Sequence, residues 1–479
     1  MTAQRPPARP TGALPPGGAR AGAPRPGGAW ARNSAKPDLQ AALAHPGLAS
    51  RVAAAAILAD VAGGHPLDDI FAGDPPSMRL SSLDTRDKSL VRSIVTVAMR
   101  RLGTLRKAIA RFIERPLPKK SAPMEWLLVC GAAQILFLDI PDHAAVDLAV
   151  RAARLDPAQA GFAGLVNAVL RNIARHKDEI LEASDPLVDD TPAWLAARWR
   201  KHYGAAAAAE IAAAHRQEPT LDLSVKSDAA GWAERLDGLL LPTGTVRLRG
   251  HAQITDLPGF EAGEWWVQDA AAALPARLVG TVSGERVGDL CAAPGGKTAQ
   301  LALAGAQVVA VDRSAERLKR LSANFARLRL SAEMRVADAL TFQAAPFDAI
   351  LLDAPCTATG TIRRHPDVAW IKRASDLATL GALQAQLLTR AASLLKPGGR
   401  LVYCTCSIEP EEGPAQIAAL LRRDPDLSRL PIDADEIGGL ADCVTEEGDM
   451  RSLPHYLPHE EARLAGMDGF FAARLKRRA

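Results

Sequence analysis

The chain has few cysteines, little net charge and no long hydrophobic run. Six cysteines in 479 residues are too few for a disulfide scaffold, and none of their spacings matches a zinc-binding pattern. The formal net charge is only +4, so a polyanionic partner would have to bind at a local basic patch. The longest uncharged stretch of the most apolar segment, residues 126–138, falls short of the roughly 20 residues that cross a bilayer. We therefore expect neither a metal site nor a membrane span.

Residues 1–45 form a basic tail that is rich in proline and glycine. The first 38 residues contain eight prolines, six glycines and six lysines or arginines, with Asp38 as the single acid. Such a segment buries too little apolar surface to offset the entropy lost on ordering, so we expect it to be disordered. It lacks an apolar secretion segment, which favours a cytoplasmic protein. The tail is then either passive or a weak electrostatic tether for a polyanion such as RNA.

Residues 46–185 show a helical pattern almost throughout. Apolar residues recur at three- and four-residue spacing, for example over residues 89–113 and 124–138, and proline-bearing turns separate these segments. This spacing predicts an all-α bundle. Between Arg79 and Lys120 there are twelve lysines or arginines against three acids. That excess indicates either a solvated helix face or, as we favour, a surface for phosphates. Its candidate contact residues are Arg100, Arg101, Arg106 and Lys107.

The remaining chain divides into a connector and a larger α/β domain. Residues 186–265 alternate short helical and strand patterns and predict a small α/β module. From residue 266 to residue 479, continuous apolar strands alternate with amphipathic helices. This alternation predicts a parallel, doubly wound sheet, whose ligands bind beyond the C-terminal ends of the strands.

A glycine-containing turn over residues 291–297 follows the first strand of that domain. It is not a P-loop, because the position that requires glycine is Cys291, and the G-x-G-x-x-G pattern is also absent. Asp312 ends the second strand, where a carboxylate can accept hydrogen bonds from ribose hydroxyls. Asp338 ends the third strand and could bind an adenine amino group. Each of these features alone could be structural, as a glycine turn or a helix cap, but together they favour a nucleotide-type cofactor.

Two cysteines lie in polar turns after apolar strands. Cys356 follows the strand that ends at Asp353, and Cys406 follows the strand that ends in Cys404 and Thr405. Cysteine attacks as a thiolate, and Lys297 nearby would raise the ionised fraction. The other four cysteines have mostly apolar neighbours and are interpreted as core residues. Cys356 and Cys406 are therefore candidates for covalent catalysis, with a core position as the alternative.

At these residues the chain resembles the NOL1/NOP2/Sun family of S-adenosylmethionine-dependent RNA cytosine-5 methyltransferases. The matching signatures are residues 266–269 (Trp-Val-Gln-Asp), 289–297 (Asp-Leu-Cys-Ala-Ala-Pro-Gly-Gly-Lys), 353–356 (Asp-Ala-Pro-Cys), 405–407 (Thr-Cys-Ser) and 468–471 (Asp-Gly-Phe-Phe). The helical segment resembles a NusB-type RNA-binding domain in residues 140–146 and 166–172. This pairing is similar to the bacterial small subunit methyltransferase B group, which acts on 16S ribosomal RNA.

The resemblance implies a fold and a set of roles. The fold would be a NusB-like bundle, the connector and a Rossmann-like methyltransferase domain. Cys406 would add to C6 of a cytosine so that C5 becomes methylated, and Cys356 would assist product release. Asp353 would contact the cofactor or the target base. S-adenosylmethionine would be held by Cys291, Ala292, Ala293, Pro294, Gly295, Gly296 and Lys297, with Asp312, Asp338 and Asp353.

The resemblance also implies an RNA partner, 16S rRNA or a precursor of the small subunit, bound by a monomer. Two alternatives stay open. The same chemistry could act on transfer RNA or on another ribosomal site, or the chain could be a ribosome assembly factor that binds RNA without catalysis. The pair of thiols argues against the second alternative, because a protein that only binds RNA needs neither.

Overall fold

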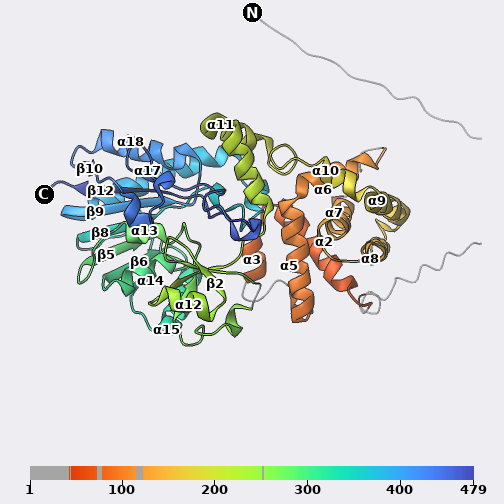
Figure 1. Ribbon diagram of the computed structural model, residues 1–479, viewed down its shortest axis with the longest axis horizontal. Helices are drawn as coiled ribbons and strands as arrows, with labels where there is room; N and C mark the ends of the chain where they lie inside the picture. Colours follow the sequence, from red (N-terminus) through yellow and green to blue (C-terminus); the bar gives the residue numbers. More distant parts are fainter. Residues whose placement is uncertain (1–42, 44, 73–77, 115–121, 251–252) are drawn as a thin grey trace, which may run out of the picture.

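The computed structural model describes residues 43, 45–72, 78–114, 122–250 and 253–479, which form two lobes (Figure 1). An all-helical lobe lies on the right of the view and a larger α/β lobe on the left, and helix α11 lies above the junction. Nearly all of the predicted tail lies outside the described residues. No helix in the described part of the chain is both long enough and apolar enough to cross a membrane.

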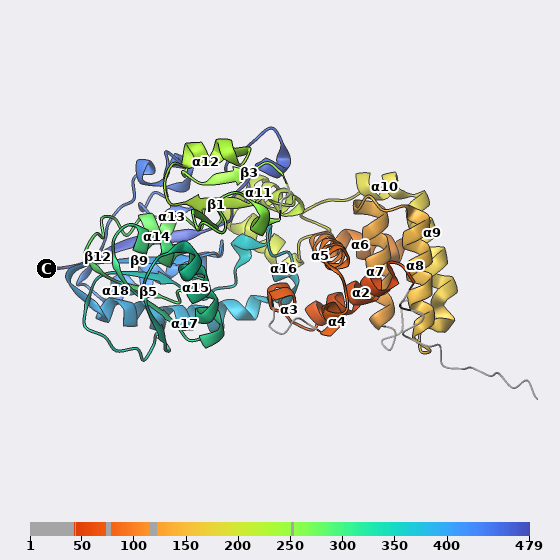
Figure 2. The same cartoon turned by 90° about the horizontal axis from the view of Figure 1, so that it is seen from below.

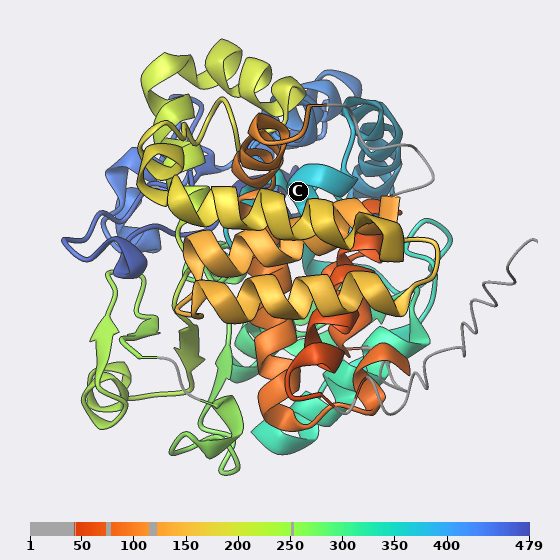
Figure 3. The ribbon, with the colours of Figure 1, turned by 90° about the vertical axis from the view of Figure 1, so that its right-hand side faces the viewer.

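The helical lobe is built around helix α7 (Ala122–Phe137), which is apolar on almost every side. Helices α7, α8 and α9 run side by side in Figure 3, and α2 and α5 also pack on α7. No strand occurs among the described residues from 48 to 216, which confirms the predicted bundle. Its other elements are α2 (Leu48–Ala62), α3 (Leu67–Ala72), α4 (Met78–Ser81), α5 (Thr85–Arg100), α6 (Leu102–Arg111), α8 (Asp142–Leu155), η2 (Ala160–Phe162), α9 (Ala163–Arg175) and α10 (Lys177–Glu182).

One predicted helix is in fact two. The apolar pattern over residues 89–113 suggested a single helix, but Arg101 leaves helical geometry with φ −121° and ψ 20°. Helix α5 ends there and α6 begins in a new direction. The apolar spacing survives this break because both helices pack on α7. The sequence pattern therefore located the buried face but could not locate the bend.

The connector contains a small antiparallel sheet. Its strands have the order β2-β3-β1-β4, and helix α12 packs beside β2 and β3. The last strand, β4, reaches Val267 and pairs with β1, so the sheet extends slightly past the predicted connector boundary. The elements are α11 (Ala193–Arg216), β1 (Asp222–Val225), α12 (Ala229–Arg235), β2 (Gly238–Leu240), β3 (Val246–Leu248), η3 (Ile254–Asp256) and β4 (Trp265–Val267).

The large sheet has the order β10-β12-β9-β8-β5-β6-β7, and β11 pairs with β12. Figure 2 shows this sheet between α17 and α18 on one side and α13 and α14 on the other. Its strands are β5 (Arg286–Leu290), β6 (Gln307–Asp312), β7 (Glu333–Val336), β8 (Phe347–Asp353), β9 (Leu395–Thr405), β10 (Leu427–Arg429), β11 (Met450–Arg451) and β12 (Phe471–Arg477). The helices are α13 (Leu274–Arg277), α14 (Gly296–Leu303), α15 (Ala315–Leu328), α16 (Val368–Ile371), α17 (Ala374–Ser393) and α18 (Pro414–Arg423), with 3-10 turns η4 (Thr359–Thr361), η5 (Pro410–Glu412), η6 (Ala434–Ile437), η7 (Ala441–Cys443) and η8 (Ala462–Leu464).

Both faces of the central strands β6, β8 and β9 are covered, which explains why the buried stretches of these strands are continuously apolar. In β9, Leu401 and Tyr403 pack toward α17 and α18, whereas Val402 and Cys404 pack toward α13. Alternate side chains of a strand point to opposite faces, so a strand buried on both faces has no polar positions in its centre. This burial fixes the strand ends, and with them the turns that follow.

The sheet is mixed rather than wholly parallel. Strands β5 to β9 are parallel, as predicted, but the C-terminal strand β12 is antiparallel to β9 and to β10. Residues 468–471 were recognised in the sequence only as a signature, and the strand that follows them was missed. Its arginines and lysine interrupt the apolar run, which hid the strand pattern.

The two lobes meet at the segment that follows Cys356. Trp370 Nε1 donates a hydrogen bond to the carbonyl of Met99 at 2.8 Å, and the amide of Leu67 donates to Asp367 at 3.0 Å. The guanidinium of Arg100 donates to the carbonyl of Arg363 at 2.7 Å. The helical lobe is therefore attached beside the edge of the sheet at which β8 and β9 end.

Candidate active site

The thiols of Cys356 and Cys406 lie in contact, with their Sγ atoms 3.4 Å apart. Strands β8 and β9 are parallel neighbours, and Asp353 pairs in register with Cys404. The chain therefore leaves both strands at the same level, and each turn carries its cysteine to the same place. Both side chains are partly exposed rather than in the core.

The third cysteine of this region, Cys404, faces away from that contact. It is fully buried, and its thiol donates to Asp353 Oδ1 at 3.5 Å. Burial and the nearby charge of Asp353 raise the pKa of Cys404 well above its ordinary value. A thiol that stays protonated is a poor nucleophile. Cys404 is therefore a structural neighbour of the site and no competitor for Cys406.

The contact with Cys406 changes the acidity of the Cys356 thiol. Its hydrogen bond with Cys406 and its burial raise the pKa of Cys356 well above the ordinary value. Either sulfur can donate in the 3.4 Å contact. The raised pKa disfavours the thiolate of Cys356, which makes Cys356 a poor nucleophile in the free protein.

Lys297 reaches the same strand ends from helix α14. Its Nζ donates to Asp353 Oδ2 at 2.8 Å and lies 5.0 Å from the centre of the Phe470 ring. Burial opposes its charged form, but the charge of Asp353 and the nearby cysteines Cys404 and Cys406 outweigh burial and raise the pKa of Lys297. A permanent ammonium group therefore lies close to the Cys406 sulfur.

The turn over residues 291–297 connects β5 to α14. Cys291 has φ 64° and Gly295 has φ 103°, a region that disfavours side chains. A Cβ at Gly295 would lie 2.6 Å from Leu321 Cγ, so the turn leaves no room for one. The amide of Ala293 donates to Asp312 Oδ2 at 3.2 Å, which ties the turn to the end of β6.

A cavity of about 80 Å³ opens beside this turn. Asp312 lies buried at one side of it, Asp338 lies at its exposed rim, and Arg313 and Arg317 border it. Apolar groups of Val311, Leu340 and Leu383 complete the lining. An apolar slot with a carboxylate at a strand end suits a nucleoside, whose base is flat and whose ribose donates hydrogen bonds. The residues present therefore fit the nucleoside half of the predicted cofactor.

Two buried carboxyl groups of the site were not singled out from the sequence. Asp289 accepts a hydrogen bond from Thr298 Oγ1 at 2.6 Å, and burial raises its pKa to about 7. Glu412 lies fully buried beneath both cysteine turns. Asp289 could have been noted because it is a charged residue inside an apolar strand. No pattern distinguishes Glu412 from its neighbours Glu409 and Glu411.

The four predicted RNA-contacting residues lie in different environments. Arg100 is buried at the lobe junction and donates to the carbonyls of His215, Gln217 and Arg363, so its guanidinium is not free for a phosphate. Burial lowers the pKa of Arg101 to about 10, and its guanidinium lies 4.9 Å from the Phe137 ring centre.

The other two residues are exposed but paired. Arg106 bonds Glu125 at 2.9 Å and Lys107 bonds Asp189 at 3.0 Å. On α5, by contrast, Arg86, Lys88 and Arg92 are exposed and have no ion-pair partner among the described residues.

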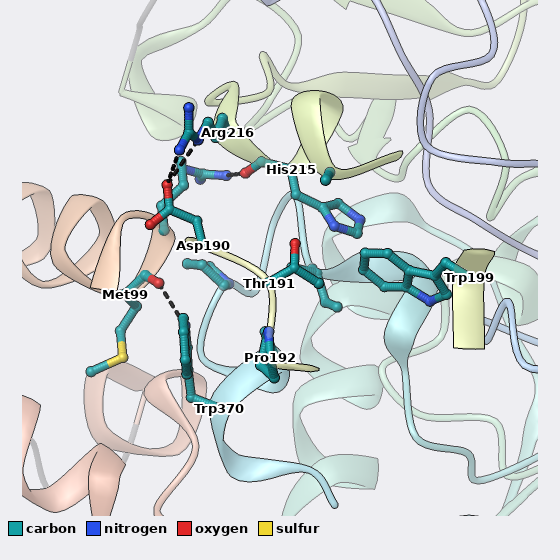
Figure 4. Close-up of a pocket in the computed structure, with 13 residues that line it drawn as sticks. Met99, Asp190, Thr191, Pro192, Trp199, His215, Arg216 and Trp370 are labelled. Atoms are coloured by element: carbon teal, nitrogen blue, oxygen red, sulfur yellow. Dashed lines mark hydrogen bonds and ion pairs between the residues drawn. The ribbon is translucent and has the colours of Figure 1, made fainter. Parts of the chain in front are cut away.

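Figure 4 shows the lobe junction, where the indole of Trp370 points at the Met99 carbonyl and Arg216 faces Asp190. The cavity there has a volume of only about 10 Å³, little more than a single water would need. Burial lowers the pKa of His215 to about 3, so this ring is neutral in the folded protein. The junction is therefore a packed contact and not a ligand site.

Comparison with known proteins places this site in a family. A family model described as 16S rRNA methyltransferase RsmB/F matches residues 277–476, which include both cysteine turns, and a NusB family model matches residues 48–175. Ribosomal RNA small subunit methyltransferase B of Serratia proteamaculans is 36% identical over 418 residues, which cover 84% of this chain and 92% of that protein. The chain belongs to the RsmB/F family of 16S rRNA methyltransferases. The resemblance predicted from the sequence is thereby confirmed.

Other RsmB/F relatives and solved structures agree. The small subunit methyltransferase B of Vibrio cholerae is 37% identical over 450 residues, covering 89% of this chain and 97% of that protein. The crystal structure of PH0851 matches with a TM-score of 0.68 at 24% identity and covers 90% of this chain and 99% of that one, which shows a shared fold. A methyltransferase homolog from Pyrococcus horikoshii matches with a TM-score of 0.50 at 27% identity, covering 63% of this chain and 98% of that one.

Proposed function

We propose that this RsmB/F protein methylates C5 of a cytosine in 16S rRNA, with S-adenosylmethionine as methyl donor and a covalent bond between Cys406 and C6 of the base. The observation that carries this proposal is the contact between the Cys356 and Cys406 thiols beside Lys297. Relatives named for 16S rRNA methylation support the substrate, since they match the chain over most of its length.

The cofactor would be held by residues 291–297 with Asp312 and Asp338. The glycine turn allows close approach of the ligand, and the cavity beside it is lined by a carboxylate and apolar groups of the kind that bind a nucleoside. When bound, S-adenosylmethionine supplies an electrophilic methyl group. Asp353 lies next to this turn, since it accepts hydrogen bonds from Lys297 and from Cys404. It can contact either the donor or the target base.

Cys406 makes C5 of the base reactive. C5 of cytosine is a weak nucleophile, but addition of the Cys406 thiolate to C6 forms an S–C6 bond and moves the C5–C6 π electrons toward C5. The Lys297 ammonium group would stabilise the thiolate before attack, because opposite charges at short range attract. As this bond forms, N3 of the ring would take up a proton from solvent, and Asp353 would accept a hydrogen bond from the new N3–H group, which stabilises the adduct.

Cys356 would release the product. In the free enzyme, the hydrogen bond with Cys406 and the charge on that sulfur hold up the pKa of Cys356. Both causes disappear when Cys406 becomes a thioether, so Cys356 can then lose its proton to solvent. The Cys356 thiolate accepts the proton from C5, the C5–C6 double bond forms again, and the S–C6 bond breaks with its electrons returning to Cys406.

The protein would act as a monomer on RNA in the cytoplasm. A base that reacts at C5 and C6 must leave its stack to enter the site. The helical lobe lies beside the edge of the sheet that carries the thiols, and its α5 surface presents Arg86, Lys88 and Arg92 without ion-pair partners among the described residues. These cations are suited to the phosphates of the flanking RNA.

Methyl transfer to deproteinised 16S rRNA, followed by bisulfite mapping, tests this function. We expect one 5-methylcytosine that depends on the protein and the cofactor. Methylation of transfer RNA alone would move the same chemistry to another substrate. Binding of 16S rRNA and cofactor without methyl incorporation would contradict catalysis and favour an assembly factor.

A further inference from the structure

Glu412 is a fully buried carboxylate that holds the residues on both sides of Cys356. The amide of Thr357, the next residue after Cys356, donates to Glu412 Oε1 at 2.9 Å and to Oε2 at 3.1 Å. The Thr357 hydroxyl also donates to Oε2. Gln384 Nε2 donates to Glu412 Oε1 at 3.0 Å and to the carbonyl of Pro355, the residue before Cys356, at 2.8 Å.

The backbone of the same residue supports the strand that leads to Cys406. The carbonyl oxygen of Glu412 accepts hydrogen bonds from the Tyr403 hydroxyl at 2.8 Å and from Thr405 Oγ1 at 3.2 Å. Tyr403 and Thr405 belong to β9 and lie just before Cys406. One residue therefore connects the Cys356 turn, through its side chain, to the Cys406 strand end, through its backbone.

The donors to this carboxylate are neutral groups. Among the described residues, no lysine, arginine or histidine makes an ion pair with Glu412, although Glu409 and Glu411 both pair with Arg198. Burying a carboxylate without a cation is costly unless hydrogen bonds replace its water. A buried acid in this position fixes its donors tightly, because removal of any donor would leave the charge less well solvated.

We propose that Glu412 is a positioning residue that holds the Cys356 turn against the end of β9 and so keeps the two thiols in contact. This inference rests on the proposed function for its catalytic meaning, since the two thiols must act on one base in succession. The negative charge of Glu412 has a second effect, because it contributes to raising the pKa of Cys356. Glu412 thus affects both where Cys356 lies and when it ionises.

Glu412→Gln is the main test, with Glu411→Gln as the matched control. The amide of glutamine has nearly the same shape as the carboxylate but only one acceptor oxygen. In either orientation of the amide, its NH2 group therefore faces a hydrogen-bond donor that the carboxylate had satisfied. Glu411 is about half exposed, with 47% of its side chain accessible, and its surface ion pair should matter little. Thr357→Val is the second variant, which removes one donor and keeps the volume.

The first readout is the spacing of the thiols, measured without RNA. Phenylarsine oxide bridges two close thiols, forming two As–S bonds and releasing one water. Wild type should bind it at a site that Cys356→Ala and Cys406→Ala both abolish. We expect Glu412→Gln to weaken this binding at least fivefold and Thr357→Val to weaken it less, whereas Glu411→Gln should stay within twofold of wild type.

The second readout is turnover. Glu412→Gln should lower kcat at least tenfold and leave the KM values for RNA and cofactor within about twofold. The pH profile of Cys356 alkylation should move to lower pH, a shift that a purely structural role would not cause.

Wild-type arsenical binding and kcat in Glu412→Gln would overturn the proposal. If this variant no longer binds cofactor because it does not fold, wild-type values in Thr357→Val would overturn it instead. A wild-type protein that methylates nothing, together with weakened arsenical binding in Glu412→Gln, would refute the proposed function and support the positioning role.

Discussion

The Sγ atoms of Cys356 and Cys406 lie within hydrogen-bond distance, 3.4 Å apart, although fifty positions separate the two residues. The contact exists because β8 and β9 are adjacent parallel strands whose turns begin at the same level. It raises the pKa of Cys356 well above its ordinary value, and this effect underlies the division of labour proposed for the two cysteines.

Replacing each cysteine should therefore stop the reaction at a different step. Cys406→Ala should abolish methyl transfer and any covalent RNA adduct, because the nucleophile is gone. Cys356→Ala should also lower turnover at least 100-fold but let the adduct accumulate, because attack survives while release fails. Denaturing gel electrophoresis of protein with labelled RNA measures the adduct. The opposite behaviour of the two variants would mean that their roles are exchanged.

The cofactor turn should not tolerate a side chain at Gly295. Gly295→Ala places a methyl group 2.6 Å from Leu321 Cγ at a φ of 103°, so the turn must move. We expect cofactor affinity to fall at least tenfold in calorimetric titrations. Gly164→Ala is the control, because a Cβ there has no neighbour within 4 Å and lies in helix α9. Equal affinity in both variants would show that the turn does not contact the cofactor.

Asp289 should make stability depend on pH. Its folded pKa is raised to about 7, whereas an unfolded aspartate has a value of about 3.9. The folded protein thus keeps a proton that the unfolded chain releases, and this stabilisation is full below about pH 4 and lost as the pH approaches 7. In the Asp289→Asn variant, the side chain at position 289 has no titratable group, so this contribution to the pH dependence is absent.

The free energy of unfolding of Asp289→Asn, relative to wild type, should therefore rise by about 2 kcal/mol between pH 5 and pH 8. Urea unfolding at both pH values measures this difference. Asp449 and Asp468 also have raised pKa values, of about 6 and about 7, but their contributions cancel when the variant is compared with wild type. A difference that does not change with pH would mean that Asp289 is ionised in the folded protein.

The α5 cations and Arg100 should affect RNA binding differently. Replacing Arg86, Lys88 and Arg92 by glutamate should weaken RNA binding and reduce the slope of log affinity against log salt by about 0.7–0.9 for each phosphate that is no longer neutralised. Arg100→Met should leave that slope unchanged but destabilise the protein by about 1–3 kcal/mol, because three carbonyls at the lobe junction, two of them buried, lose their donor. Filter binding across a salt series and thermal unfolding distinguish the two effects. An unchanged slope in the triple variant would place the RNA elsewhere.

The sequence pattern correctly predicted the alternating strands and helices of the α/β domain and the turns that follow its buried strands. The two strands predicted to end at Asp312 and Asp353 end at those residues in the structure, because burial on both sides makes their apolar runs continuous. The break at Arg101 and the antiparallel strand β12 were missed, because both depend on contacts with distant segments.

The candidate site was also predicted only in part, because some of its features depend on contacts between residues that are distant in the sequence. The thiols and the cofactor turn could be identified because each follows a strand, but the burial of Arg100 depends on a contact with Arg363 that is distant in sequence. Counting charges along α5 and α6 therefore grouped a buried junction residue with exposed ones. Glu412 illustrates the point most clearly, since its role comes from donors on three separate elements.

The most direct test of the account is to trap the bond between protein and base. RNA with 5-fluorocytosine at the target position carries fluorine where the C5 proton would leave, so the adduct cannot be released after methylation. Digestion and mass spectrometry of the trapped complex should find the nucleotide on the peptide that contains Cys406. A nucleotide attached to Cys356 or Cys404, or methylation of unmodified RNA without any trapped adduct, would contradict the central claim.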